Sequence, residues 1–355
     1  MIAADAPDQA VAAHHGDPLA EQRSMARAAG IVDRGNRGVI AVPGADRLTW
    51  LHQLVSQHVE ALEAGSGTEA LVLDLQGRVE HHVVLSDVDG TLRLDTEPAR
   101  AGPLAEYLVA MRFWSDVAPD DVSADWAVLT LLGPSTPDVL AAAGLPVPAG
   151  DYASLPLDGG GIVRRMPWPG SDAADLLVPR AAQPAWWSRL VDAGAAPAGT
   201  MAFEAMRAAA LQPRLGVDTD DRTIPHEVGW IGSAVHLDKG CYRGQETVAR
   251  VANLGRPPRQ LVLLHFDEGD AQLPVTGDPV VLGERTVGRV GTVAQHHELG
   301  PIALALLKRS VPVDAELVAG VDERAAPARI DPDSVPPEPE APPPGRAAQL
   351  RGGLR

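Results

Sequence analysis

The sequence predicts an α+β fold in which two mixed lobes are followed by a small β-barrel. Its 355 residues are too many for one ordinary core, and 45% hydrophobic residues can fill two or three domains. Up to about residue 255, strands and helices follow one another in a recurring order that is typical of sheets with helices on one side. From about Gln260 the helical period disappears and short apolar strands alternate with turns, which favours a barrel.

The first lobe is predicted to open with the strand GVIAV and an amphipathic helix. In this helix Leu48, Leu51 and Val55 share one face. Two strands then pair across a turn at Gln76 and Gly77. The predicted elements are strands at 38–42, 69–75, 78–87 and 91–95, and helices at 45–59 and 103–112.

A second cycle of the same kind predicts the second lobe, and a run of strands predicts the barrel. The second lobe has predicted strands at 127–133, 161–168 and 174–179, and helices from Ser135, at 184–193 and at 200–211. The barrel strands are predicted at 261–266, 279–283, 285–296, 302–309 and 315–320.

Both ends of the chain are predicted to lie outside these domains. Residues 1–30 have neither the basic start nor the apolar core of a signal peptide, so we expect a flexible N-terminal arm. Residues 325–355 hold 8 of the 32 prolines and few large apolar residues, so we expect a disordered tail. The predicted domains are therefore a two-lobed module over 31–255 and a barrel over 256–324.

Composition excludes several classes of function. A net charge of −17 argues against direct binding of nucleic acid or anionic lipid over the whole surface. A single cysteine allows no internal disulfide and fits a cytoplasmic location. No apolar stretch approaches the ~18 residues that suggest a membrane span, so no membrane partner is expected.

The run KGCYRGQETVAR contains the only cysteine, Cys241. A short helix is predicted over 244–253, so Lys239, Arg243 and the helix start should all lower the pKa of the thiol. A thiolate there suits nucleophilic or metal chemistry, with an inert buried thiol as the alternative. One thiol does not hold an iron-sulfur cluster alone, but it can lend one ligand.

Two further patterns bear on ligands. The stretch 238–259 carries five cations against two anions, which suits either a carboxylate or phosphate site or a solvated helix face. No histidine spacing matches a metal motif, and no P-loop or Rossmann fingerprint occurs, so no metal site is predicted. The adjacent pair His81 and His82 should point to opposite faces of a strand.

The motif KGCYRGQETVAR resembles the signature of the YgfZ-type folate-binding proteins, relatives of the glycine-cleavage T-protein. Similar stretches are RAAALQPRLGVDTDDRTIPHEVGW, GVIAVPGADRLTWLHQLVSQHV and VGRVGTVAQHHELGPIALALLKR, so the resemblance spans roughly residues 31–324. It implies a cloverleaf of two ferredoxin-like lobes around a central folate cavity, plus a C-terminal barrel. It also implies tetrahydrofolate as cofactor, and a role in iron-sulfur cluster assembly that includes tRNA-modifying clients.

The resemblance also implies roles for single residues. Cys241 and Lys239 of the motif are the expected reactive groups. The expected folate-binding residues are Asp218, Arg207, Glu227, Trp230 and Tyr242. The residues themselves leave alternatives: Asp218 as a turn cap, Arg207 as a partner of Glu204, and Trp230 as plain core.

One departure from the family pattern concerns the reaction. Where aminomethyltransferases carry paired aspartates after a Gly-Gly turn, this chain has QGRVEHH, with Glu80 and His81 at the acidic pair. Replacing a carboxylate with an imidazole changes both charge and reach. We therefore expect a tetrahydrofolate-binding accessory protein with iron-sulfur assembly or client proteins as partners. The alternative is a folate-dependent aminomethyltransferase or demethylase.

Overall fold

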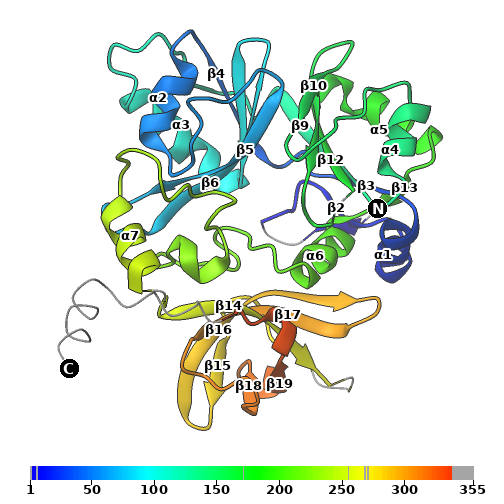
Figure 1. Ribbon diagram of the computed structural model, residues 1–355. Coiled ribbons are helices and arrows are strands. Elements are labelled where there is room, and N and C mark those ends of the chain that lie inside the picture. The colour runs from blue at the N-terminus through cyan, green and yellow to red at the C-terminus, as the bar shows by residue number, and fades with distance from the viewer. Residues whose placement is uncertain are drawn as a thin grey trace, which may run out of the picture.

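Three units make up the fold, with two mixed lobes side by side and a barrel beneath them (Figure 1). The computed structural model describes residues 2–4, 7–170, 172–254, 256–267, 269 and 272–337. Within this part of the chain, none of the helices has the length and apolarity that crossing a bilayer requires.

The first lobe is a five-stranded antiparallel sheet with two helices packed on it. Its strands, in spatial order, are β5 (Ser66–Leu73), β6 (Val79–Val88), β7 (Thr91–Thr96), β4 (Gly38–Pro43) and β8 (Asp120–Asp121). The helices α2 (Arg47–Leu54) and α3 (Ala101–Ala110) bury apolar residues such as Leu51 and Leu104 against this sheet.

The second lobe is a six-stranded sheet. Its strands, in spatial order, are β10 (Ser154–Pro156), β11 (Ile162–Met166), β12 (Ala173–Pro179), β9 (Trp126–Leu132), β3 (Gly30–Asp33) and β13 (Ala196–Ala198). Helices α4 (Thr136–Ala142) and α5 (Gln183–Asp192) bury Leu140 and Leu190 in the core of this lobe. Strand β3 therefore belongs to the second lobe, although it precedes the first along the chain.

The third unit is a closed barrel, as the sequence predicts. Its strands, in spatial order, are β14 (Arg259–Phe266), β17 (Gly300–Lys308), β16 (Arg285–His296), β15 (Pro279–Leu282), β18 (Leu317–Ala319) and β19 (Ala326–Ile330). The α+β architecture with a terminal barrel is thus confirmed.

Two predicted boundaries are wrong. Strand β19 closes the barrel by pairing with β14 and β18, so the barrel extends beyond residue 324, and residues 338–355 of the predicted tail lie outside the described residues. The predicted flexible arm instead contains strands β1 (Ile2–Ala3) and β2 (Ala12–His14) and helix α1 (Pro18–Arg27). Met25 of α1 is buried among residues of both lobes.

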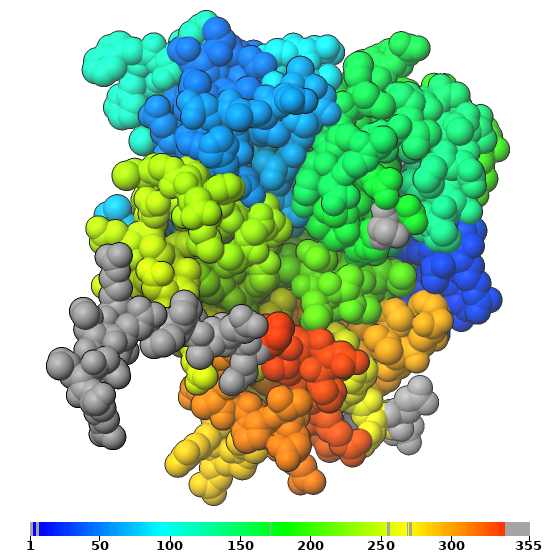
Figure 2. Space-filling view, in the orientation of Figure 1, coloured from blue at the N-terminus to red at the C-terminus, as the bar shows by residue number. Residues whose placement is uncertain are grey.

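Two helices connect the lobes to the barrel. Helix α6 (Thr200–Ala209) packs against β16 of the barrel, and helix α7 (Gln245–Leu254) begins just after the KGCY motif. The irregular stretch between them covers the side of the first lobe that faces the barrel, in yellow-green in Figure 2. Gly244 shows why a glycine is needed here, because an added Cβ would lie 2.5 Å from the carbonyl oxygen of Asp74.

Candidate functional site

A cavity of about 530 Å³, including its opening to solvent, lies where the two lobes meet helix α6. Its walls come from the β3–β4 connection, strand β6, the ends of β7 and β11, helix α6 and the residues after it. The lining residues are Asp8, Arg34, Asn36, Arg37, His82, Glu97, Trp168, Thr200, Phe203, Glu204, Arg207, Pro213, Arg214 and Leu215.

The cavity is rich in cations although the protein as a whole is strongly acidic. Four arginines face three carboxylates in its lining. Burial alone would raise the pKa of Glu204, but Arg207 and Arg214 outweigh it and lower this pKa to about 2. Glu204 therefore stays ionised. The lining has one more arginine than carboxylate, and three of the arginines also pair with acids behind the wall, namely Arg34 with Asp175, Arg37 with Asp95 and Arg207 with Asp218.

Arg214 ties several segments together at the cavity wall. It donates two hydrogen bonds to Asp8 at 2.6 and 2.7 Å and one to Glu97 at 2.8 Å. Glu97 also accepts a bond of 2.9 Å from Arg37. The N-terminal segment is therefore part of the cavity wall.

A second network supports the cavity from the side of β6. His82 lines the cavity, and its Nε2 lies 2.7 Å from a carboxylate oxygen of the buried Glu69. Tyr152 and Trp168 also donate hydrogen bonds to Glu69. Burial would raise the pKa of Glu69, but His82 and these donors together hold it below its ordinary value. An ionised Glu69 accepts the Nε2–H of His82 and fixes this ring.

The KGCY motif uses its lysine as a structural group. The ammonium of Lys239 donates to the carbonyl oxygens of His52, Val55 and Gln57, at 2.5 to 3.1 Å. An ammonium has three donors, so all of them are occupied. These oxygens lie at and beyond the C-terminus of α2, where a cation is favoured. Burial lowers the pKa of Lys239 to about 8.

Cys241 is exposed and is not among the residues that line the described cavity. The groups expected to activate it are engaged elsewhere: Lys239 bonds the end of α2, and Arg243 lies 2.9 Å from a carboxylate oxygen of Glu80. Helix α7 begins at Gln245, so Cys241 precedes its first turn, within which the effect of a helix terminus is concentrated. The Cys241 thiol is therefore open to solvent and lies outside the lining of the described cavity.

Comparison with known protein families shows to which family the chain belongs. Residues 13–239 match the model of the GCVT N-terminal domain, which is more than half of the chain. The chain belongs to the GCVT family. A curated relative, an aminomethyltransferase of Rubrobacter xylanophilus, is 31% identical over 88% of this chain and 84% of its own length. Another aminomethyltransferase, from Streptomyces avermitilis, is 25% identical over 88% of this chain and 87% of its own.

A solved GCVT structure shares the fold. The glycine cleavage system aminomethyltransferase T from Bartonella henselae has a TM-score of 0.78, covers 88% of each chain and is 18% identical. This likeness confirms the predicted GcvT-like architecture. The family model ends at Lys239, so Cys241 lies beyond the matched region.

The acidic residues predicted to hold folate are engaged by protein groups in this GCVT chain. Asp218 is buried and accepts bonds from Arg207, the backbone N–H of Arg214 and that of Thr292, at 2.7 to 2.9 Å. Glu227 accepts bonds of 2.7 and 2.8 Å from Arg259. Both carboxylates fasten the stretch after α6 to neighbouring segments.

The aromatic residues predicted to hold folate lie in the core, whereas Arg207 lines the cavity. Trp230 stacks on His82, with ring centres 4.8 Å apart and planes 9° from parallel. Tyr242 is buried, and burial raises its pKa to about 12. Trp230 thus acts on the cavity through His82, whose ring it supports.

The two residues at the place of the family's acidic pair, Glu80 and His81, lie in different environments. Glu80 is partly exposed and pairs with Arg243, while His81 is buried with its Nδ1 unpartnered. The next residue, His82, is the one that reaches the cavity, as the predicted alternation of His81 and His82 allows. The sequence analysis does not predict His82, or the arginines of the β3–β4 connection, as cavity residues. For His82, the alternation of side chains along β6 is the signal that could have identified it.

Proposed function

We propose that this chain binds tetrahydrofolate or a related reduced folate in the cavity between the lobes. The observation that carries the proposal is an arginine-rich cavity, open to solvent, at the seam of the two lobes of a GCVT-family chain. Trp168 and Phe203 offer aromatic surface to a flat ring, and the arginines offer partners to the carboxylates of a folate tail.

Isothermal titration with tetrahydrofolate tests this proposal. The wild-type protein should bind saturably, and Trp168→Ala should weaken binding at least about tenfold, because it removes aromatic wall and a donor to Glu69. Trp114→Ala is the matched control, since Trp114 is 98% exposed and does not line the cavity. Absence of saturable binding to folded wild-type protein would remove the proposal.

For its cellular role, we propose that the protein supports iron-sulfur cluster assembly or repair in client enzymes. The supporting observations are the YgfZ-like motif and an exposed lone thiol that is free to lend one ligand to a cluster in transit. In a strain lacking the protein, Cys241→Ser should fail to restore iron-sulfur enzyme activity while keeping folate affinity. Full restoration by this variant would show that Cys241 is dispensable.

The alternative is a folate-dependent aminomethyltransferase or demethylase, favoured by the names of the relatives. Against it, Glu80 pairs with Arg243, and the carboxylates of Glu97 and Glu204 are held by arginines. Asp8 pairs with Arg214, so every carboxylate that lines the described cavity has an arginine partner. None of these carboxylates is therefore free to transfer a proton. Formation of methylene-tetrahydrofolate from an aminomethyl donor would establish this alternative over the accessory role.

A further inference from the structure

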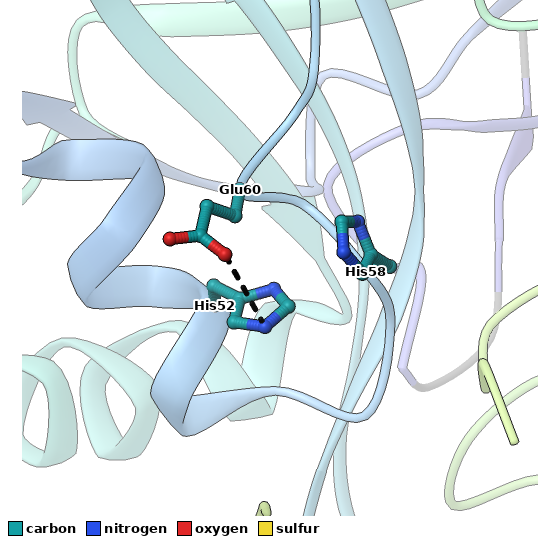
Figure 3. A group of neighbouring side chains, drawn as sticks. All are labelled: His52, His58 and Glu60. Carbon is teal, nitrogen blue, oxygen red and sulfur yellow. Dashed lines mark ion pairs between the residues drawn. The ribbon is translucent and has the colours of Figure 1, made fainter. Parts of the chain in front are cut away.

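Two histidines and a glutamate gather at the end of α2, away from the cavity described above. His52 lies in the last turn of the helix, and His58 and Glu60 lie in the loop that follows (Figure 3). One potential ligand atom of each side chain lies within 4.8 Å of the other two. We propose that these three side chains bind a divalent transition-metal ion, with Zn²⁺ as the best match.

The ligand set supports this assignment. Two imidazoles and one carboxylate are a set that proteins use for zinc with an open coordination position. His58 and Glu60 are exposed, so water can occupy the remaining positions. Nitrogen-rich sites favour the later first-row metals over Mg²⁺ or Ca²⁺, which prefer oxygen alone.

Binding one ion requires the three ligand atoms to move closer together than the 4.8 Å within which they lie. The Nε2 of His52 and a carboxylate oxygen of Glu60 are 3.9 Å apart, marked by the dashed line in Figure 3. Ligand atoms about 2.0–2.1 Å from a tetrahedral zinc are roughly 3.4 Å apart. Rotations of two exposed side chains, His58 and Glu60, can supply the difference. Metal binding at Nε2 leaves the ring proton on Nδ1 and gives up the bond from the Val59 N–H, which is long at 3.4 Å.

Two charged groups lie near the histidines, the ammonium of Lys239 and the carboxylate of Glu60. The positive charge of Lys239 disfavours binding of a metal cation nearby. Its ammonium, however, faces backbone carbonyl oxygens, and the negative charge of Glu60 compensates for it.

His236 extends the site towards the KGCY motif. Its ring centre is 5.5 Å from that of His58, and its backbone N–H bonds the carbonyl oxygen of Ser56. A metal at this position would join the end of α2 to the loop after it. With His236 as a further ligand, it would also fix the segment that leads to Lys239 and Cys241.

The test is Zn²⁺ titration of the tag-free full chain after removal of metal with a chelator, followed by Co²⁺ spectroscopy. We expect one ion per chain, and d–d bands without a thiolate-to-cobalt charge-transfer band. His58→Gln and Glu60→Gln, at exposed positions, should each weaken binding at least about tenfold. His265→Gln is the matched control, because His265 pairs with Asp331 in the barrel.

Two outcomes would overturn the proposal. One is the absence of stoichiometric Zn²⁺ binding to the folded chain at micromolar concentration. The other is a Zn²⁺ affinity that is unchanged in both His58→Gln and Glu60→Gln, which would show that Zn²⁺ binds at other residues. Cys241→Ser should leave Zn²⁺ binding intact, since no thiol takes part. These readouts do not depend on folate, so this proposal and the proposed function can fail separately.

Discussion

Lys239 shows how the role of one residue depends on partners that are distant along the chain. Its place beside Cys241 suggests chemistry, yet its ammonium bonds three carbonyl oxygens of residues 52–57. Asp218 behaves in the same way, since one of its partners, Thr292, is 74 residues away. A motif shows which charges lie together along the chain, but it does not show which backbone groups fold against them.

We expect Lys239→Met to lower the free energy of unfolding by about 3 kcal/mol, because it leaves buried carbonyl oxygens without donors. Urea denaturation followed by circular dichroism measures this change. Lys308→Met is the control, since Lys308, the other lysine of the chain, is exposed and bonds a single carbonyl oxygen. Equal effects of the two variants would contradict the structural role of Lys239.

At the scale of elements, the predicted helices and strands with strong apolar periodicity are all present. The first thirty residues are the exception. Helix α1 buries Glu21 and Gln22, which look like surface residues in the sequence. Glu21 accepts from the backbone N–H groups of His15 and Gly199, and Gln22 donates to the carbonyl of Gln295. A helix whose buried face is polar carries little periodic signal.

The junction of α6 with β16 gives a prediction for glycine. A Cβ on Gly291 would lie 2.3 Å from a carboxylate oxygen of Asp218, which is held in place by Arg207 and two backbone N–H groups. Gly291→Ala should therefore destabilise the protein by about 2 kcal/mol. Thermal unfolding measures the effect.

Gly102→Ala is the matched control, since Gly102 lies in α3 with open space around its Cα. This change should stabilise the protein by roughly 0.5–1 kcal/mol, because alanine favours a helix more than glycine does. A stabilising Gly291→Ala would show that the barrel is not packed against Asp218 as described.

At the scale of the whole molecule, buried ion pairs join the two lobes. Arg164 of β11 is fully buried and bonds Asp95 of the first lobe and Asp175 of its own lobe, at 2.5 and 2.7 Å. Arg37 bonds the other oxygen of Asp95. Because each charge has partners, the interface between the lobes tolerates complete burial of an arginine.

Arg164→Met should destabilise the protein by about 3–5 kcal/mol, since it leaves Asp95 and Asp175 short of a buried partner. Arg165→Met is the adjacent control, where a part-exposed side chain lies 3.7 Å from Asp172 and the change should be below about 1 kcal/mol. Chemical denaturation distinguishes the two. A small effect at Arg164 would contradict a charge-linked interface.

Acid should weaken the fold in two pH windows. Burial lowers the pKa of His81 and of His226 to about 4, below the ordinary 6.5, so both are neutral in the fold. The unfolded chain then binds more protons, and stability falls as the pH drops from 6.5 towards 4. Glu204, with a pKa of about 2, adds a further loss between pH 4.5 and 2.

Melting temperature measured against pH checks this prediction. In His226→Phe the loss between pH 6.5 and 4 should be smaller, because both ring nitrogens of His226 are buried without partners. A wild-type melting temperature that stays constant over that window would contradict buried neutral histidines.

The sequence by itself determined the order of the helices and strands, the change to a barrel near residue 260 and the family, because these depend on local periodicity and contiguous motifs. Only the tertiary structure decided which side chains share a site. Lys239, Asp218 and Glu227 bond protein groups from segments distant in sequence. His82 and Arg214 line the cavity together with residues that are also distant along the chain. Burial and pairing of charge are properties of the assembled fold, so no local pattern fixes them.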